Sequence, residues 1–241
     1  ESQLLGSQND MATIRLRYED LDAQGRVKIP AILNYLQNAA VMNAAAVGYD
    51  MDRMAELDLC WVVMCWDVKL GRRIRWNEAL TVETWPYQFY GSIGKRGFRI
   101  LSAQGEVLAE ADSWWALLRQ SDQTMADVSP EMADAFRVSG KAPFPLHRPR
   151  GKEQVTEEAF PVSRFDIDTN GHVNNSRFAE MACSFVPDLS CVEEVMVEYK
   201  HSAHLGDHIL PSFECGEEGA YVSLSSPENL LYVKMQVKYK S

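Results

Sequence analysis

Hydrophobic residues between positions 29 and 47 recur at helical spacing. The residues on this stripe are Ile32, Tyr35, Leu36, Ala39 and Ala40. Residues three and four positions apart share one face of a helix, so the stripe can pack against a core. Pro30 suits the first turn of a helix, and Gly48 suits the position just past its end. The pattern predicts one long core helix over 29–47.

A different pattern follows the predicted helix. Segments rich in Val, Trp, Tyr and Phe alternate with short turns that contain glycine or polar residues. These segments cover residues 59–68, 80–89, 97–105 and 106–119. Such segments are typical of β-strands, so we expect a sheet after the helix. The run 91–97 lacks the spacing of a phosphate loop or a dinucleotide-binding motif, and we expect a hairpin turn there.

Residues 138–152 (VSGKAPFPLHRPRGK) combine prolines, glycines and positive charges, which is typical of an extended connector. The order of elements then repeats. A strand-like start and a polar turn lead into a predicted helix over 175–186, and further strand-like segments follow it. We therefore expect an N-terminal domain over 11–137, a linker over 138–152 and a C-terminal domain over 153–241.

The two halves also match at the level of single residues. The first-half residues are Asp20, Leu21, Asp22, Gln24, Gly25 and Val27, and a shift of 146 positions lays them on Asp166, Ile167, Asp168, Asn170, Gly171 and Val173. An internal repeat of this kind indicates a duplicated unit. A long helix wrapped by a curved antiparallel sheet, used twice in one chain, is the tandem (double) hot-dog fold of the α+β class, and we expect this architecture.

Composition and charge narrow the class of protein. The chain has 241 residues with 46% hydrophobic and 24% charged, as in an ordinary globular protein. Its formal net charge of −10 repels nucleic acid and anionic membranes. The longest apolar run, Leu59–Trp66, is far too short for a membrane span. Five cysteines without CxxC pairs favour free thiols and a cytoplasmic location. Residues 1–10 lack a signal or transit pattern, and we expect them to be a short lead-in.

The polar turn of the second half carries the residues best suited to chemistry. It reads DTNGHVNN and contains Asp168, Asn170 and His172, whereas the first half has Asp22, Gln24 and Arg26 at the same places. A carboxylate can fix an imidazole or a neighbouring amide, an amide can donate to an oxyanion, and histidine can take a proton from water. These roles suffice for hydrolysis of an acyl bond. The same residue types also form ordinary Asx turns and helix caps, and the triplet alone leaves both readings open.

The segment RFDIDTNGHVNNSRF resembles the DxNxHVNN motif of the acyl-acyl carrier protein thioesterase family. The segments GRRIRWNEALTVETW and ADSWWALL are similar to further motifs of that family, and the resemblance runs from about Thr13 to Tyr239. It implies a hydrolase that releases a free fatty acid from acyl carrier protein, with the acyl chain held largely by the first hot dog and no cofactor. Asp168, Asn170 and His172 would then occupy the catalytic positions.

The chain departs from the family pattern after Tyr199. The family has a Glu-Cys pair a few residues after a tyrosine, and this chain has Ser202 and Ala203 instead. A cysteine nucleophile at this place is excluded, so we expect water as the nucleophile, with Ser202 as a water-orienting residue. Glu180 is a weaker candidate for the missing carboxylate, since an ordinary ion pair with Arg177 three positions earlier explains it better.

Two further features of the sequence bear on metal binding and on partner docking. The histidines and acid of HSAHLGDH, at 201–208, lie on a strand where side chains alternate between faces, so we predict no metal site there. Positive charge gathers in three segments, 72–75, 95–99 and 148–152, and an acidic carrier protein needs such a patch for docking. We expect that patch at Arg148, Arg150 and Lys152.

Several alternatives to an acyl carrier protein thioesterase stay open at this point. The enzymatic one is a thioesterase for acyl-coenzyme A, and the non-enzymatic one is a catalytically weakened hot-dog protein that binds acyl carriers. A hot-dog hydratase fits less well, because its DxNPxH motif has one more residue between Asp and His than separates Asp168 from His172. The sequence allows a monomer or a homodimer.

Overall fold

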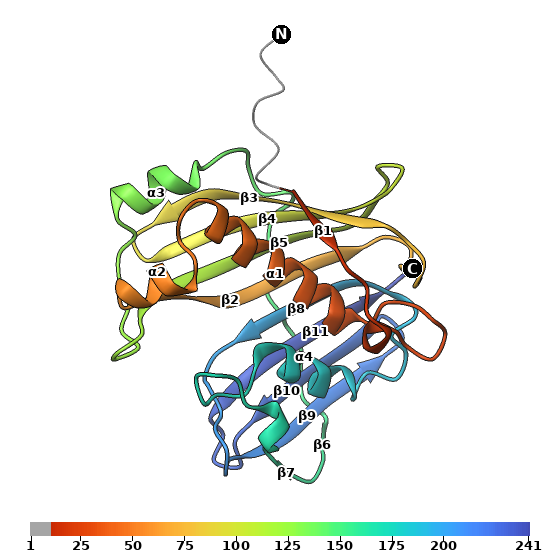
Figure 1. Cartoon of the computed structure of the whole chain (residues 1–241). Coiled ribbons are helices and arrows are strands. Elements are labelled where there is room, and N and C mark those ends of the chain that lie inside the picture. The colour runs from red at the N-terminus through yellow and green to blue at the C-terminus, as the bar shows by residue number, and fades with distance from the viewer. Residues whose placement is uncertain (1–10) are drawn as a thin grey trace. The chain divides into compact units, whose positions relative to one another are not determined.

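The computed structural model describes residues 11–241, and the predicted lead-in over 1–10 lies outside the described residues. The chain forms two compact units (Figure 1). The first runs to Met64 and resumes from Gly71 to Leu146, and the second comprises Cys65–Leu70 with His147–Ser241. Each unit pairs one main helix with an antiparallel sheet, which is the tandem hot-dog fold predicted from the sequence.

The first unit places helix α1 (Ile29–Ala46) against its sheet. The strands follow the order β1-β3-β4-β5-β2. Their bounds are Met11–Ile14 for β1, Leu59–Leu70 for β2, Leu80–Tyr90 for β3, Ile93–Ser102 for β4 and Val107–Arg119 for β5. The first of these strands, β1, pairs with β3, and the successive hairpins β3-β4 and β4-β5 are antiparallel. The first hairpin turn is shorter than predicted: Gly91, with φ +57°, and Ser92 form it, whereas residues 93–97, also expected in the turn, belong to β4.

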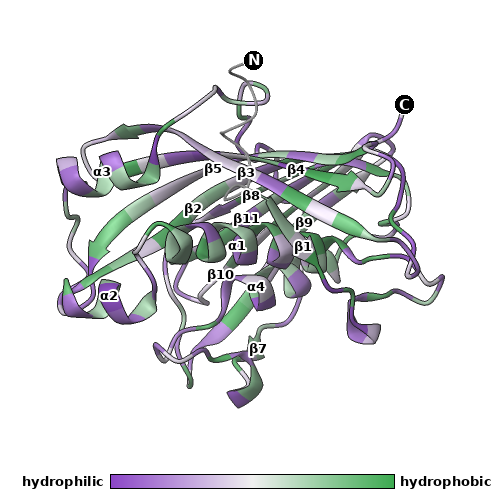
Figure 2. Cartoon of the chain, turned by 45° about the horizontal axis from the view of Figure 1, so that its top comes forward, coloured by the Kyte–Doolittle hydropathy of each residue, from purple (hydrophilic) through white to green (hydrophobic). Residues whose placement is uncertain are grey.

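The long helix matches its prediction to within one residue. All five residues of the predicted stripe are buried, and Pro30 occupies the first turn. The helix is apolar along much of its length in Figure 2, where it lies against strands that alternate between apolar and polar stretches. Burial of this stripe against the sheet, more than helix propensity, stabilises α1.

Two short helices of the first unit were not predicted. They are α2 (Met51–Glu56) and α3 (Pro130–Phe136). Each begins at a capping side chain, because Asp50 accepts the backbone N–H of Arg53 and Ser129 accepts that of Met132. Helices of one to two turns show too few repeats for a periodic pattern, although their caps are readable in the sequence. A 3₁₀ turn, η1 (Tyr18–Asp20), precedes α1.

The second unit repeats this plan. Helix α4 (Asn175–Cys183) is its main helix, and a 3₁₀ turn, η2 (Arg164–Asp166), precedes it. The strand order is β2-β8-β11-β10-β9-β6, with β7 also on β9. The bounds are Val192–Tyr199 for β8, His208–Gly216 for β9, Gly219–Ser225 for β10, Leu231–Tyr239 for β11, Val155–Thr156 for β6 and Phe160–Pro161 for β7.

The helix α4 is shorter than the sequence predicted. It ends at Cys183, with Ser184 as its C-cap, and not at Val186. Pro187 disfavours helical backbone at the residue before it and cannot donate a helical hydrogen bond, so the chain leaves the helix early. The last residues form single turns, in which Val186 N–H donates to the carbonyl of Cys183 at 3.1 Å.

The irregular segment 138–152 contains no helix or strand, as its composition predicts. From His147 onward it lies against the sheet of the second unit, and we call residues 147–154 the strap. The N–H of His147 donates to Asp67 Oδ2 at 2.7 Å, and the N–H of Arg150 donates to Gln236 Oε1 at 3.0 Å. Gln154 N–H then donates to a carbonyl of β9 at 3.1 Å. The strap therefore crosses several strands of one sheet.

The cysteines and helices agree with the predicted class of protein. All five cysteines are free thiols. Within residues 11–241, no helix combines the length and the apolar character needed to cross a membrane.

Candidate active site

A tight turn of the second unit holds the three predicted catalytic residues. Asp168 N–H donates to the carbonyl of His172 at 2.8 Å and closes the turn. Asp168 Oδ1 accepts the N–H of Asn170 at 2.8 Å and that of His172 at 3.3 Å. Asp168 and His172 are half-buried, and Asn170 is exposed. The carboxylate of Asp168 thus positions the other two residues through the backbone of the turn.

The first unit contains the same turn. Asp22 N–H donates to the carbonyl of Arg26 at 2.8 Å, and Asp22 Oδ1 accepts the N–H groups of Gln24 and Arg26, both at 2.9 Å. At the tip, Gly25 has φ +71° and Gly171 has φ +77°, a left-handed conformation that glycine adopts without strain. The predicted duplication is confirmed at the level of individual hydrogen bonds.

The two turns differ in the side chains that meet the neighbouring segment. In the second unit the backbone of His172 pairs with that of His204, and their imidazole rings lie edge to face with centroids 4.7 Å apart. In the first unit Arg26 pairs with Arg75 at the same place. Imidazole exchanges a proton near neutral pH, whereas guanidinium keeps its charge. The second unit therefore has two titratable rings where the first has two permanent cations.

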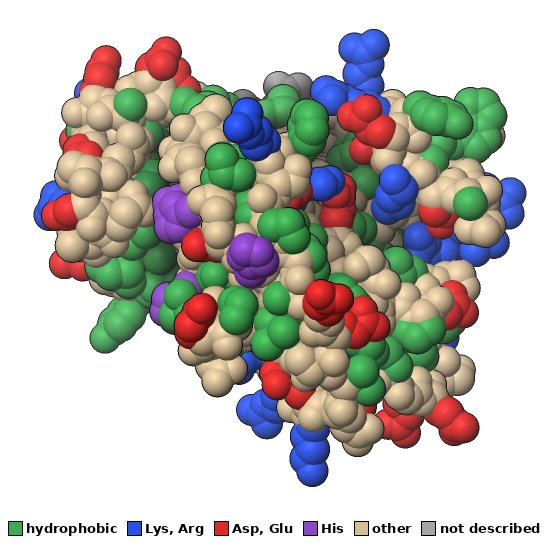
Figure 3. Space-filling model, turned by 90° about the horizontal axis from the view of Figure 1, so that it is seen from below, with side chains coloured by type: hydrophobic (Ala, Val, Ile, Leu, Met, Phe, Trp, Pro, Cys, Tyr) green, Lys and Arg blue, Asp and Glu red, His purple; other side chains and the backbone are tan. Residues whose placement is uncertain are grey.

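The facing segment is duplicated as well. Glu78 Oε2 accepts the N–H of Arg75 at 2.8 Å, and Asp207 Oδ2 accepts the N–H of His204 at 2.8 Å. Asp207 Oδ2 also lies 3.6 Å from His204 Nδ1. The side chains of His204 and Asp207 are both accessible to solvent. The face drawn in Figure 3 carries histidines among acidic and apolar side chains. A carboxylate thus lies next to the imidazole pair.

The residues that replace the expected Glu-Cys pair run alongside the turn. Val173 N–H donates to the carbonyl of Ala203 at 2.8 Å. Ala203 is fully buried and Ser202 is exposed. Ser202 lies two residues from His204 on this segment, so its hydroxyl is open to water near the turn.

The weaker carboxylate candidate forms the predicted ion pair. Glu180 is exposed and binds the guanidinium of Arg177 three positions earlier. Nε and Nη2 of the same guanidinium also donate to Asp166 Oδ1, each at 3.0 Å. The structure therefore explains Glu180 as part of an ion-pair network at the start of α4.

The polar run 201–208 does not converge on one point. Its first histidine, His201, places Nδ1 2.8 Å from the carbonyl of Leu231, away from His204. Among residues 11–241, the potential metal ligands that lie close together belong to a different group, Asp67, His147 and Glu194. These three are far apart in the sequence, and only pairing of β2 with β8 and the path of the strap bring them together.

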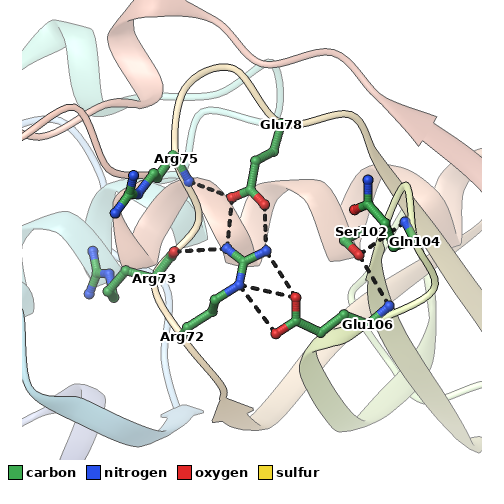
Figure 4. Close-up of polar contacts among 7 residues, drawn as sticks. All are labelled: Arg72, Arg73, Arg75, Glu78, Ser102, Gln104 and Glu106. Atoms are coloured by element: carbon green, nitrogen blue, oxygen red, sulfur yellow. Dashed lines mark hydrogen bonds and ion pairs between the residues drawn. The ribbon is translucent and has the colours of Figure 1, made fainter.

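Two of the positive segments are largely held by internal partners. Arg72 binds Glu78 and Glu106 at once, with contacts of 2.6 to 3.2 Å (Figure 4). Arg96 is buried and donates to Asn43 Oδ1 at 2.9 Å. Guanidinium groups engaged in this way support the fold of the first unit and present little charge to a partner.

The third positive segment lies on the strap. Arg148 Nε is 3.5 Å from Glu198 Oε2, and Lys200 Nζ is 3.1 Å from the other oxygen of that carboxylate. Arg150 and Lys152 are exposed. The predicted docking residues thus share one irregular segment, with Arg148 partly neutralised and the other two facing solvent.

Comparison with known proteins matches both halves of the chain. The family model described as the acyl-ACP thioesterase N-terminal domain matches residues 8–136, and that of the C-terminal domain matches residues 150–224. The chain belongs to the acyl-ACP thioesterase family. The residues that differ between the duplicated turns, His172 and His204, lie in the part that matches the C-terminal model of the family.

Two relatives with similar sequences are plant proteins. The chain is 26% identical over 221 residues to the chloroplastic oleoyl-acyl carrier protein thioesterase of Coriandrum sativum, covering 83% of this chain and 58% of that protein. It is 23% identical over 249 residues to the chloroplastic dodecanoyl-[acyl-carrier-protein] hydrolase of Cinnamomum camphora, covering 92% and 63%. The chain therefore spans about three fifths of the length of these relatives.

Solved structures of the family share the fold. An acyl-ACP thioesterase from Bacteroides thetaiotaomicron superposes with a TM-score of 0.82 at 20% identity, covering 96% of this chain and 98% of that one. The 12:0-ACP thioesterase from Umbellularia californica gives 0.81 at 19% identity, covering 95% and 96%. Both cover the two hot-dog units of the chain.

One residue of the site was missed as a partner of the predicted triplet. The sequence placed His204 in a polar run and gave no sign that it meets His172. The structure shows a second match between the halves, because Arg75 and Glu78 make the same contact as His204 and Asp207. Residue types are not conserved across this second match, so only the contacts reveal it.

Proposed function

We propose that the chain hydrolyses fatty acyl-acyl carrier protein to a free fatty acid and the holo-carrier, with water as the nucleophile. The water oxygen attacks the thioester carbonyl carbon, the carbon–sulfur bond breaks, and the carrier's phosphopantetheine thiol leaves. The catalytic turn at Asp168–His172 supplies the groups for this reaction, and no protein-bound intermediate forms. Membership of the acyl-ACP thioesterase family supports this activity.

Each residue of the turn has a distinct role. His172 takes a proton from the attacking water and returns it to the leaving thiolate. The exposed amide of Asn170 donates to the oxyanion that develops on the carbonyl oxygen. Asp168 acts as a positioning residue, since its Oδ1 fixes the N–H groups of Asn170 and His172. Ser202, on the neighbouring segment, orients the water.

His204 and Asp207 assist this proton transfer. The imidazole of His204 lies edge to face with that of His172, and the carboxylate of Asp207 is 3.6 Å from His204 Nδ1. When His172 becomes a cation, the neighbouring ring and carboxylate stabilise its charge. This pair stands in for the carboxylate of the family's Glu-Cys pair.

One observation carries the proposal. The chain builds the same turn twice with the same backbone hydrogen bonds, and only the second copy has imidazoles at the two facing positions. A turn kept for structure alone works with Arg26 and Arg75, so the structural requirement does not explain His172 and His204.

Family membership also supports a proposal for the partner and for the place of the acyl chain. We assign carrier-protein docking to Arg150 and Lys152, with Arg148 holding the strap, because an acidic carrier needs exposed positive charge. We assign the acyl chain to the first hot-dog unit. The free thiols are consistent with a reducing compartment such as the cytoplasm.

The test compares wild type with His172→Gln, His204→Gln and Arg26→Gln in hydrolysis of oleoyl- and dodecanoyl-carrier substrates. We expect His172→Gln to lower kcat by about 10²- to 10⁴-fold and His204→Gln by about tenfold. Arg26→Gln changes the matched turn of the first unit, so its kcat should stay within about threefold of wild type. Circular dichroism checks that each variant is folded.

Other outcomes decide between the remaining functions. Faster turnover of the same acyl group on coenzyme A than on the carrier protein would assign the chain to acyl-coenzyme A. Binding of acyl carrier without turnover of either thioester by wild type would make it a binding protein. Equal loss of activity in His172→Gln and Arg26→Gln would remove the catalytic role of the imidazole.

A further inference from the structure

Two carboxylates and an imidazole meet on the sheet of the second unit, away from the catalytic turn. Asp67 comes from the part of β2 that belongs to this unit, Glu194 from β8 and His147 from the start of the strap. Asp67 is 0% exposed and Glu194 is 7% exposed. Acidic side chains are almost never buried to this extent unless a cation or a proton neutralises them.

The distances between the three groups suit a small divalent cation. His147 Nδ1 lies 3.2 Å from Glu194 Oε1 and 3.8 Å from Asp67 Oδ2, and all three ligand atoms lie within 4.8 Å of one another. Tetrahedral ligands at about 2.0–2.2 Å from a zinc ion are separated by about 3.3–3.6 Å. Small side-chain adjustments therefore bring the three atoms to coordinating distance.

One oxygen of the Asp67 carboxylate is available to coordinate an ion. Its Oδ2 accepts the N–H of His147 at 2.7 Å, but its Oδ1 is buried without a hydrogen-bond partner. A buried acceptor left unpaired costs free energy, which coordination to a cation recovers.

The other charges around the cluster are compatible with a bound ion. Lys238 Nζ lies 3.7 Å from Glu194 Oε2, whereas His147 lies near the other oxygen, Oε1. Lys69 is the further positive group near Asp67. Two ionised carboxylates balance the charge of one divalent ion. The side chain of His147 is 53% exposed, so an ion can reach the cluster from solvent.

We propose that Asp67, His147 and Glu194 form a binding site for a divalent transition-metal ion of the zinc type. A nitrogen ligand together with two carboxylates favours Zn²⁺ over Mg²⁺ or Ca²⁺, which prefer oxygen ligands alone. The ion ties the first residue of the strap to two strands of the sheet. It takes no part in thioester hydrolysis.

The test measures binding of Zn²⁺, with Mg²⁺ as the comparison ion, to the metal-free chain of 241 residues by isothermal titration calorimetry and by metal analysis after dialysis. We expect one equivalent of Zn²⁺ more in wild type than in His147→Gln, Asp67→Asn or Glu194→Gln. The exposed histidine variant His208→Gln should keep this equivalent. Thermal unfolding of wild type should shift upward with Zn²⁺, and that of His147→Gln should not.

A variant at Asp67 or Glu194 can fail to fold because both carboxylates are buried. His147 is exposed, so His147→Gln leaves those two carboxylates intact and still tests metal binding. Equal Zn²⁺ binding by wild type and His147→Gln would overturn the proposal. So would the lack of any binding by wild type, and the cluster would then be a carboxyl pair that shares a proton. Neither result bears on hydrolysis, which His172→Gln tests separately.

Discussion

At the scale of single residues, the duplicated turn shows which features the two halves share and which side chains differ between them. Asp22 and Asp168 make the same contacts with backbone N–H groups, so this aspartate is required by the turn itself. His172 was predicted from the sequence, since it differs in kind from Arg26. Its neighbour His204 was not predicted as its partner, because their contact depends on which segment lies beside the turn. Sequence spacing alone does not contain that information.

A buried carboxyl group of the first unit makes stability depend on pH. Asp112 is almost fully buried, accepts the hydroxyl of Tyr87 at 2.9 Å, and burial raises its pKa to about 6 from 3.8. Between these two values the folded state keeps a proton that the unfolded state has lost, so this group lowers stability as pH rises from about 4 to 6. Asp112→Asn removes the effect while keeping an acceptor for Tyr87.

We therefore expect Asp112→Asn to gain stability relative to wild type as pH rises, by about 1–3 kcal/mol between pH 4 and pH 7.5. Urea unfolding of both proteins at the two pH values measures the difference. Asp127→Asn, at an exposed position, controls for loss of a charge. A difference that stays constant with pH would contradict the assignment.

At the scale of elements, the periodic segments were predictable and the aperiodic ones were not. The 18-residue α1 and the long strands carry enough repeats to be read from the sequence. The helices α2 and α3 do not, and Pro187 shortens α4. The strap was recognised as an irregular connector, but its path across the sheet follows from side-chain contacts with Asp67 and Gln236 that no local pattern encodes.

A glycine of the strap tests how closely this segment packs. A Cβ added to Gly151 would overlap Cβ and Cγ of Tyr221 on β10. Gly151→Ala should therefore lower the free energy of unfolding by about 1–3 kcal/mol. Gly216→Ala, where a Cβ meets nothing within 4 Å, should change it by no more than about 0.5 kcal/mol. Urea unfolding compares the two, and equal effects would mean that the strap is not held as described.

At the scale of the whole molecule, negative charge exceeds positive charge, and part of the positive charge is held in internal ion pairs. The formal net charge is −10, and several cations are engaged in ion pairs with acids of the same unit, as Arg72 is with Glu78 and Glu106. The proposed partner, an acidic carrier protein, would therefore need a local patch of exposed positive charge for docking. Arg150 and Lys152 are exposed on the strap and can provide it.

We expect the double variant Arg150→Glu, Lys152→Glu to raise KM for carrier-bound substrate by about tenfold with little change in kcat, because docking charges act on encounter more than on chemistry. The KM of wild type should rise with salt between about 0.05 and 0.3 M, and that of the variant should rise less. The same acyl group on coenzyme A is the control, since it has no acidic protein to dock. An unchanged KM for the carrier substrate would place docking elsewhere.

The division of strand β2 limits how the two halves can be separated. Cys65–Leu70 belong to the second unit and pair with β8, although they precede the linker by some seventy residues. A C-terminal fragment cut at the linker would lack this strand and leave the backbone of β8 unpaired on the side where β2 lies. An unpaired strand edge promotes aggregation. Chimeras that exchange halves between relatives therefore have to carry this short piece of β2 along with the half that follows the linker.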